Sequence, residues 1–342
     1  MTNKLIQFQE VFKINNQNYE SFEKILIIAE AASNHDNDYK KAINLIDIAA
    51  SAGCDAIKFQ LFSADKIIQR SRPGWKVLKS LEIPRHWLPN LLKYAHKKKL
   101  FFGISCFDCD SIVFLKKLKI DFLKIASTEI QDLNLIKKAA QTKIPLIVST
   151  GASDIKDIFL ACEAIRLYHN NFSILHAVSI YPAKNHQLNL RMIKSIKNTF
   201  GVNTGFSDHS LSTFAPCMAA TLGASVIEKH ITFDRSEKGP DHYFALEKKE
   251  LAEMVRGIRE SEVALGNSLK QPAIKNERRG LARRIVARRK IKANQTIKRS
   301  DLTIKRADHN GIHSEDFEKI INLKVVRSIK KDEIIKWKFF KK

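Results

Sequence analysis

The sequence lacks the features that place a chain in a membrane or in an oxidising compartment. It has no run of about 18 apolar residues, and the densest early stretch, Ile25 to Ala32, is interrupted by Glu30, which excludes a transmembrane helix. The first 24 residues carry polar and charged groups throughout, so no secretory signal is visible. The five cysteines are an odd number and fit reduced thiols better than a disulfide framework. We therefore expect a cytoplasmic protein.

Glycine and proline are scarce, at 12 and 8 of 342 residues, which excludes collagen-like and linker-dominated chains. The 44% apolar and 28% charged residues are the usual mixture of a globular protein. Acidic residues are outnumbered, because 59 Lys and Arg against 36 Asp and Glu give a net charge of +23. This charge would attract nucleic acid, anionic membranes or anionic metabolites, or it would lie on a solvated surface.

Apolar runs alternate with stretches of helical period between residues 24 and 265. Buried parallel strands have continuous apolar runs of this kind, and eight strand-then-helix units over about 240 residues are typical of a (β/α)8 TIM barrel. A doubly wound open sheet is the alternative, but no Gly-rich phosphate loop follows the first run. The predicted strands are Lys24–Glu30, Ala56–Gln60, Leu100–Ser105, Phe122–Ser127, Leu146–Thr150, Ser173–Ser179, Val202–Ser207 and Ser225–His230. The predicted helices include Tyr39–Ala52, His86–Lys99, Asn134–Gln141, Ile155–His169, Leu190–Asn198, Ser212–Leu222 and Glu247–Leu265.

Two regions lie outside this alternation. Residues 5–23 predict a short hairpin with Asn15-Asn16-Gln17-Asn18 as its turn. A basic stretch follows Gly266, and beyond it short strands and turns predict a small β-rich module. The predicted division is a barrel domain over 1–268, a basic linker over 269–283 and the module over 284–342. The strands expected in the module are Ile285–Ala287, Ile297, Leu302–Lys305, Lys324–Val326 and Ile334–Phe339.

Polar residues gather where the predicted strands end, which is where catalytic groups lie in a TIM barrel. Lys58 and Lys124, expected on neighbouring strands, form with serine hydroxyls and the Ser-Thr-Gly turn at 149–151 a cradle for a small anion that carries a phosphate. His209 and His230 end adjacent strands and predict a shared divalent metal. Glu30 is a candidate acid or base in the same mouth. Each residue alone also has a structural interpretation, but their joint occurrence favours a functional site.

The chain resembles the sialic acid synthase family, the nonulosonate synthases that condense phosphoenolpyruvate with an N-acetylated amino sugar. The resemblance runs from about residue 8 to the C-terminus. That family pairs a TIM barrel with a C-terminal module similar to type III antifreeze protein, the SAF domain, and residues 285–306 resemble this module. The family usually reads A-E-I-G at its first strand, whereas this chain has Ala-Glu-Ala-Ala over 29–32. The matching strings are IIAEAASNH, AGCDAIKFQLF, LKIASTEI, IVSTG, LHAVSIYPA, GFSDHS, VIEKHITFDR and GPDH.

The resemblance also implies roles for individual residues. His209 and His230 would bind manganese, or else magnesium or cobalt, and Glu30 would be the catalytic carboxylate. Arg306 would reach from the module into the barrel of a partner subunit, which implies a domain-swapped homodimer. The residues that would hold phosphoenolpyruvate are Lys58, Gln60, Ser105, Lys124, Ser127, Ser149 and Ser207, and those that would meet the sugar are Glu129, Tyr181, Asp241 and Arg306.

The expected reaction joins phosphoenolpyruvate, water and an N-acetylated amino sugar such as N-acetylmannosamine into a nine-carbon 2-keto sugar acid, with release of phosphate by C–O cleavage. A legionaminate or pseudaminate synthase that uses a diacetamido-trideoxyhexose is one alternative, and a non-catalytic basic binding protein on the same fold is another. The Arg pairs near residues 278–289 lack interleaved aromatics, so no nucleic-acid partner is expected. Cys106 and Cys109 form a C-x-x-C without a second pair, and we expect loop cysteines there.

Overall fold

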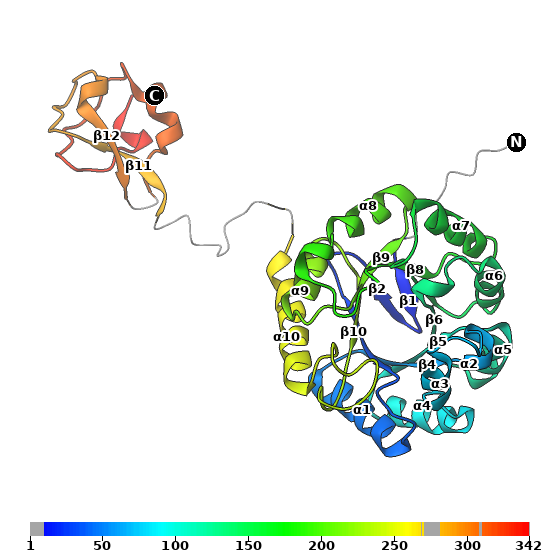
Figure 1. Cartoon of the computed structure of the whole chain (residues 1–342). Helices are drawn as coiled ribbons and strands as arrows, with labels where there is room; N and C mark the ends of the chain where they lie inside the picture. Colours follow the sequence, from blue (N-terminus) through cyan, green and yellow to red (C-terminus); the bar gives the residue numbers. More distant parts are fainter. Residues whose placement is uncertain (1–9, 268, 270–280, 308–309, 342) are drawn as a thin grey trace, which may run out of the picture. The chain divides into compact units, whose positions relative to one another are not determined.

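The computed structural model describes residues 10–267, 269, 281–307 and 310–341. The chain divides into two compact units, Met1–Gly266 and Asn267–Lys342. The first unit is a closed barrel in which eight parallel strands follow one another in chain order and the last pairs with the first. Helices form a ring around these strands (Figure 1). The predicted TIM barrel is confirmed, and the open sheet is excluded.

The barrel strands are close to those predicted, since their ends differ by at most one or two residues. The strands are β3 (Leu26–Ala32), β4 (Ala56–Leu61), β5 (Phe101–Cys106), β6 (Phe122–Ile125), β7 (Leu146–Ser149), β8 (Phe172–Ala177), β9 (Asn203–Asp208) and β10 (Val226–His230). The helices are α1 (Tyr39–Ala52), α2 (Ala64–Ile67), α3 (Trp75–Ser80), α4 (Leu88–Lys97), α5 (Cys109–Leu118), α6 (Leu133–Gln141), α7 (Ile155–Arg166), α8 (Arg191–Phe200), α9 (Phe214–Thr221) and α10 (Lys248–Leu265).

Three helices were not predicted. The short helices α2 and α3 span too few residues for a helical period to show. In α5 the four consecutive apolar residues 112–115 hide the period, although only Ile112 and Leu115 of these four are buried. The expectation of loop cysteines is wrong, because Cys106 ends β5 and Cys109 begins α5.

Aspartates begin several of the barrel helices. The carboxylates of Asp38, Asp108, Asp132 and Asp154 accept hydrogen bonds from backbone N–H groups in the first turns of α1, α5, α6 and α7. These bonds satisfy donors that have no partner within the helix. Each cap fixes the point at which the chain leaves the barrel mouth and turns into the outer ring.

A hairpin closes the amino-terminal end of the barrel. It consists of β1 (Phe12–Ile14) and β2 (Gln17–Tyr19), and its buried side chains pack against the first inward-facing residues of the barrel strands. The hairpin is confirmed from residue 12 onward, and residues 5–9 of the prediction lie outside the described residues. The predicted four-residue turn is wrong, because Ile14 pairs with Gln17 and only two asparagines turn the chain. Phe122 fills the barrel interior beside Gly103, where an added Cβ would lie 2.1 Å from its ring.

The second unit contains a two-stranded antiparallel sheet of β11 (Arg283–Ala287) and β12 (Leu302–Arg306). The predictions near Ile297 and Lys324–Val326 are corrected to isolated bridges, Thr296–Lys324 and Val325–Phe340. The predicted strand Ile334–Phe339 is wrong, because Ile334 forms one bridge and Trp337–Phe339 is a 3-10 helix. Most of the predicted linker lies outside the described residues. The buried core of this unit is Ile285, Ala287, Ile291, Ile297, Leu302, Ile312, Ile320, Val325, Ile329, Ile335, Phe339 and Phe340.

Within the part of the chain that the structure describes, none of the helices combines the length and the apolar character that crossing a membrane requires.

Candidate active site

A cavity of about 400 Å³ opens at the carboxyl ends of the barrel strands. Every strand of the barrel, or the loop directly after it, contributes a predicted site residue to its lining. Glu129 is the one predicted barrel residue that does not line the cavity, although its neighbour Thr128 does. The predicted residues that do line it are Glu30, Lys58, Gln60, Ser105, Lys124, Ser127, Ser149, Tyr181, Ser207, His209, His230 and Asp241.

Two lysines and two carboxylates form a buried cluster inside this cavity. The Nζ atom of Lys124 lies 2.6 Å from Oε1 of Glu228, and Nζ of Lys58 lies 3.7 Å from Oε2 of the same carboxylate. Lys58 also forms an ion pair with Glu30. All four side chains are buried. Removing an ion from water costs several kcal/mol even when it is paired, so such a cluster is weak evidence for stability. Its position in a cavity points to ligand binding instead.

The two lysines differ in their tendency to hold a proton. Burial lowers the pKa of Lys124 to about 8, even though Glu228 favours its charged form. Burial also opposes the charge of Lys58, but the carboxylates of Glu228 and Glu30 together raise the pKa of that lysine. For Glu228, burial is outweighed by the two ammonium groups, which hold its pKa well below the usual range. Lys58 and Glu228 are therefore charged at neutral pH.

Glu228 is the residue that the sequence-based prediction missed. It lies on β10, two residues before His230. Its side chain lies between the two lysines and also accepts a hydrogen bond from Oγ of Ser207 at 2.9 Å. The expectation that Lys58 and Lys124 lie on neighbouring strands is wrong, because β5 separates β4 from β6. It is Glu228, on β10, that brings the two ammonium groups together.

Glu30 lies near the end of β3, directly before a register shift against β4. Its Oε1 accepts a hydrogen bond from Nε2 of Gln60 at 2.8 Å, and its Oε2 faces the ammonium of Lys58. Burial raises the pKa of Glu30, with Lys58 acting in the opposite direction. A carboxylate whose proton affinity is raised in this way is suited to accept a proton during catalysis.

Hydroxyl groups surround the lysines. Lys58 donates a hydrogen bond to Oγ of Ser105 at 2.6 Å, and Oγ of Ser127 accepts the backbone N–H of Gly151 at 2.9 Å. The Oγ of Ser149 is buried and has no hydrogen-bond partner among the described residues. A buried hydroxyl without a partner loses free energy unless a ligand or water satisfies it. The arrangement of lysines and hydroxyls therefore fits an oxygen-rich anion.

The two histidines lie side by side on adjacent strands, with ring centroids 5.4 Å apart. Nδ1 of His209 lies 2.7 Å from the carbonyl oxygen of Val178, so this nitrogen carries the proton and Nε2 is left as an acceptor. Burial lowers the pKa of both His209 and His230, so both rings are neutral at physiological pH. Neutral imidazole is the form that binds a metal ion.

These residues fit a divalent metal. Nδ1 of His230 is buried and has no hydrogen-bond partner within the described part of the chain, as expected of a nitrogen that ligates when a metal is bound. The neighbouring lysine–carboxylate cluster is electrically neutral when all four groups are ionised, so an incoming anion would gain from an added cation. No set of three or more metal-binding side chains occurs among the described residues. Water or substrate would have to complete the coordination.

The residues predicted to meet the sugar are only partly brought together. The ring of Tyr181 lies 4.3 Å from that of His209, and Asp241 accepts hydrogen bonds from both the backbone N–H and the hydroxyl of Ser33. Glu129 belongs to a 3-10 turn beside the cavity, and burial raises its pKa. Arg306 is exposed at the end of β12 in the second unit, so its predicted contact with the sugar stays a prediction.

The two parts of the chain match two family models. The NeuB family model matches residues 45–270, and the SAF domain model matches residues 282–341. The chain belongs to the NeuB family. The resemblance expected from the sequence strings is thereby confirmed, and so is the SAF domain behind the barrel.

Individual relatives of this NeuB family member are similar over nearly the whole chain. The spore coat polysaccharide biosynthesis protein SpsE of Bacillus subtilis is 36% identical, over 95% of this chain and 96% of its own. The N,N'-diacetyllegionaminic acid synthase of Legionella pneumophila is 33% identical, over 91% of this chain and 93% of its own. Sialic acid, legionaminic acid and pseudaminic acid synthases all occur among the relatives.

A solved structure agrees with this assignment. The N-acetylneuraminic acid synthetase of Leptospira borgpetersenii has a TM-score of 0.75 and 30% sequence identity, and the match covers 80% of this chain and 96% of that chain. The solved structure and the family models therefore agree on the fold and the family. Similarity does not identify the acceptor sugar, because the relatives are synthases of different products.

Proposed function

We propose that this protein is a nonulosonic acid synthase. It condenses phosphoenolpyruvate with an N-acetylated amino sugar such as N-acetylmannosamine, and water, to give a nine-carbon 2-keto sugar acid and phosphate. The observation that carries the proposal is the single cavity in which the buried Lys58 and Lys124 lie beside two neutral histidines. Family membership supports the reaction class, and the site residues support the division of labour described below.

In this proposal the lysine side of the cavity binds phosphoenolpyruvate. Lys58 and Lys124 supply positive charge, and Ser105, Ser127 and Ser149 supply hydroxyl donors around the anion. Gln60 and Ser207 complete this half of the site. The bound molecule is held with its methylene carbon toward the aldehyde of the open-chain sugar, so the protein's contribution to the first step is positioning.

The bond changes follow from the chemistry of the enol phosphate. The methylene carbon attacks the aldehyde carbon, which forms the new C–C bond, and the aldehyde oxygen takes up a proton from water. Positive charge develops on the former enol carbon, and water adds there while Glu30 accepts its proton. The resulting tetrahedral intermediate loses phosphate by cleavage of the C–O bond, and its hydroxyl proton passes to the leaving phosphate as the 2-keto group forms. Because Glu30 lines the same cavity as the two lysines, its charge can also stabilise the cationic carbon.

His209 and His230 would hold the divalent ion, for which manganese is our first choice and magnesium or cobalt the alternatives. When bound, such an ion polarises a carbonyl oxygen and so makes the aldehyde carbon more electrophilic. The hydrogen bond from His209 to the backbone of Val178 keeps the ring orientation and the tautomer that this role requires.

More than one sugar fits the role of acceptor substrate. N-acetylmannosamine is the first candidate, and a 2,4-diacetamido-trideoxyhexose, as used for legionaminic or pseudaminic acid, is the alternative. Tyr181 and Asp241 face the part of the cavity where these sugars would bind. A non-catalytic basic binding protein would not need a buried lysine–carboxylate cluster at the mouth of a barrel. The cluster therefore disfavours this alternative function.

The test is phosphate release from phosphoenolpyruvate in the presence of manganese, across N-acetylmannosamine and both diacetamido sugars, with mass spectrometry of the acid formed. Phosphoenolpyruvate labelled with ¹⁸O in its bridging oxygen provides the mechanistic control. We expect one sugar to give a nine-carbon acid and the label to leave with phosphate, as C–O cleavage requires. Label retained in the acid would overturn the mechanism. No release from folded, metal-loaded protein with any sugar would overturn the proposed function.

A further inference from the structure

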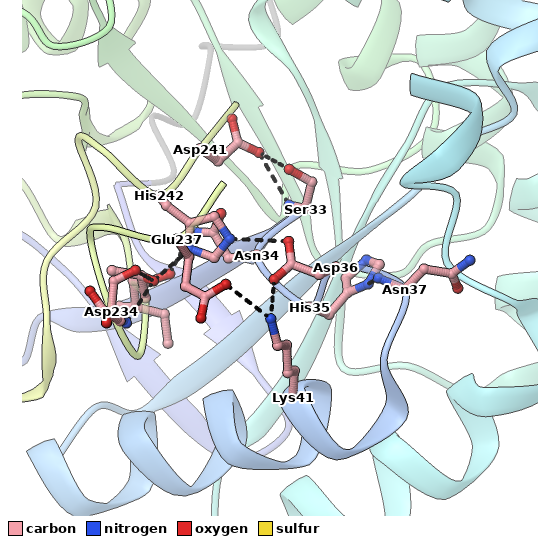
Figure 2. Close-up of polar contacts among 12 residues, drawn as sticks. Ser33, Asn34, His35, Asp36, Asn37, Lys41, Asp234, Glu237, Asp241 and His242 are labelled. Atoms are coloured by element: carbon pink, nitrogen blue, oxygen red, sulfur yellow. Dashed lines mark hydrogen bonds and ion pairs between the residues drawn. The ribbon is translucent and has the colours of Figure 1, made fainter. Parts of the chain in front are cut away.

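The loop after β10 presents two opposite faces. Pro240, Asp241, Tyr243 and Phe244 line the cavity, whereas His242 in their midst does not and is fully buried on the other side of the loop. Figure 2 shows His242 directed toward the loop that follows β3, away from the side chain of Asp241. The conformation of the cavity-lining segment therefore depends on what holds His242.

His242 is fixed at both ring nitrogens. Its Nδ1 lies 2.7 Å from Oγ1 of Thr232, and its Nε2 lies 3.1 Å from Oδ1 of Asp36. The other carboxylate oxygen of Asp36 accepts Nζ of Lys41 at 2.7 Å, and the same ammonium lies 3.3 Å from Oε2 of Glu237. We call Asp36, Lys41, Glu237 and His242 the rim clasp; these four residues are joined by dashed lines in Figure 2. The clasp ties the β10–α10 segment to the start of α1.

The backbone is shaped to admit the clasp. A Cβ at Gly239 would lie 2.7 Å from Cδ2 of His242 and 3.6 Å from Oδ1 of Asp36, so only glycine leaves the histidine its place. Asp36 has a φ of 48°, a left-handed conformation that Asp and Asn tolerate better than most residues. Two independent backbone features therefore serve the same side-chain contact.

A second contact reaches the cavity itself. Oδ2 of Asp241 accepts hydrogen bonds from Oγ of Ser33 at 2.5 Å and from its backbone N–H at 3.2 Å. Both bonds use the same oxygen, so a ligand in the cavity can be met by Oδ1. The orientation of Asp241 is thus set from the β3–α1 loop, the loop that the rim clasp holds against the β10–α10 segment.

We propose that the rim clasp is a positioning device for the acceptor sugar: it holds Asp241 and the flanking aromatic residues at the geometry that binds the sugar, and it does not contribute to phosphoenolpyruvate binding. This inference rests on the proposed function. No clasp residue lines the cavity, so the clasp acts through Asp241. Of the residues proposed to bind phosphoenolpyruvate, Lys124 and Ser149 lie on β6 and β7, across the barrel from β3 and β10, and none belongs to the loops that the clasp joins.

The first experiment replaces Asp36 with Asn, because Asn keeps the left-handed backbone but removes the charge that pairs with Lys41 and strengthens the contact to His242. We expect the KM for the sugar to rise about tenfold and the KM for phosphoenolpyruvate to change by less than about twofold. Lys41→Met should raise the sugar KM by about threefold, because that ion pair is partly exposed. Lys40→Met, on the exposed neighbour, is the matched control and should change neither constant. Equal increases in both KM values would overturn the proposal.

The double variant Asp36→Asn, Lys41→Met should raise the sugar KM no further than Asp36→Asn alone, because both changes break one network. A measurement that does not require turnover keeps the inference separate from the proposed function. Hydrogen exchange over residues 239–244 should become faster in Asp36→Asn and in Gly239→Ala, while β6 and β7 stay as protected as before. Unchanged exchange there would overturn the clasp even if the wild-type enzyme is fully active. An inactive wild type with faster exchange in the variants would overturn the proposed function and the assignment of the clasp to a sugar.

Discussion

Replacement of Glu30 should separate the binding of phosphoenolpyruvate from its turnover. We expect Glu30→Gln to abolish phosphate release while phosphoenolpyruvate binding is largely kept. Glutamine has the same shape but cannot take up a proton, and Lys58 still has Glu228 at 3.7 Å. Phosphate release and calorimetric titration with phosphoenolpyruvate measure the two effects, and thermal unfolding checks the fold. Lost binding in a folded variant would contradict the role of Glu30 as a base.

The lowered pKa of Lys124 predicts a loss of phosphoenolpyruvate binding in alkaline solution. Its ammonium is charged below the pKa of about 8 and neutral above it, so the attraction for the anion is lost as the pH rises. We expect kcat/KM for phosphoenolpyruvate to fall by about tenfold per pH unit above that value, since this ratio reports groups of the free enzyme.

Lys124→Arg supplies the control for this pH profile. A guanidinium stays charged throughout the range, so the decline near pH 8 should be absent from the variant even if its overall rate is lower. A decline at the same pH in the arginine variant would assign it to another group.

Twelve of the residues predicted from the sequence line one cavity, and what the prediction missed has physical causes. Side chains alternate between the two faces of a strand. In β10 this directs Glu228 and His230 into the barrel and leaves Lys229 to pair with Asp208 outside it. That alternation was a signal for Glu228 which the prediction did not use. The left-handed backbone of Ala32, with a φ of 47°, could not be predicted, because it accompanies a register shift that no local sequence pattern marks.

The amino-terminal hairpin should contribute measurably to the stability of the barrel. Phe12 is fully buried against the barrel interior, so Phe12→Ala should lower the free energy of unfolding by about 3–5 kcal/mol. Phe22 lies just beyond the hairpin and is 49% exposed, so Phe22→Ala should cost about 1 kcal/mol or less. Denaturant unfolding measures both. Similar costs for the two variants would show that the hairpin does not close the barrel core.

Element prediction succeeded where burial dictates the residue type. The barrel strands are buried on both faces, so each consists mostly of consecutive apolar residues and can be predicted from its own sequence. The strands of the second unit are short and paired partly by single bridges, so their residues carry no period of their own. The Ile334–Phe339 stretch shows this limit, because an apolar segment became a bridge followed by a 3-10 turn.

Across the whole molecule, most of the net positive charge and the candidate site lie in different parts of the sequence. Residues 267–342 contain 23 Lys and Arg against 8 Asp and Glu, so most of the excess charge of +23 lies in the second unit and its connector. The lysines of the cavity are instead balanced by carboxylates. Composition therefore did not reveal the site, which was visible only through the spacing of residues along the barrel.

The domain-swapped homodimer that the family resemblance implies predicts that two inactive variants restore each other's activity. If Arg306 of one chain completes the cavity of its partner, Glu30→Gln and Arg306→Ala are each inactive or strongly impaired alone. In a mixed dimer, the barrel of the Arg306→Ala chain has its own Glu30 and receives the intact arginine of the other chain, so one of the two sites of that dimer is whole.

Random mixing puts about half of the chains in mixed dimers, as for any two-fold oligomer. Activity should therefore recover to about a quarter of wild type when the two variants are unfolded and refolded together. Refolding each variant separately before mixing is the control, and no recovery after joint refolding would mean that each chain uses its own arginine or none.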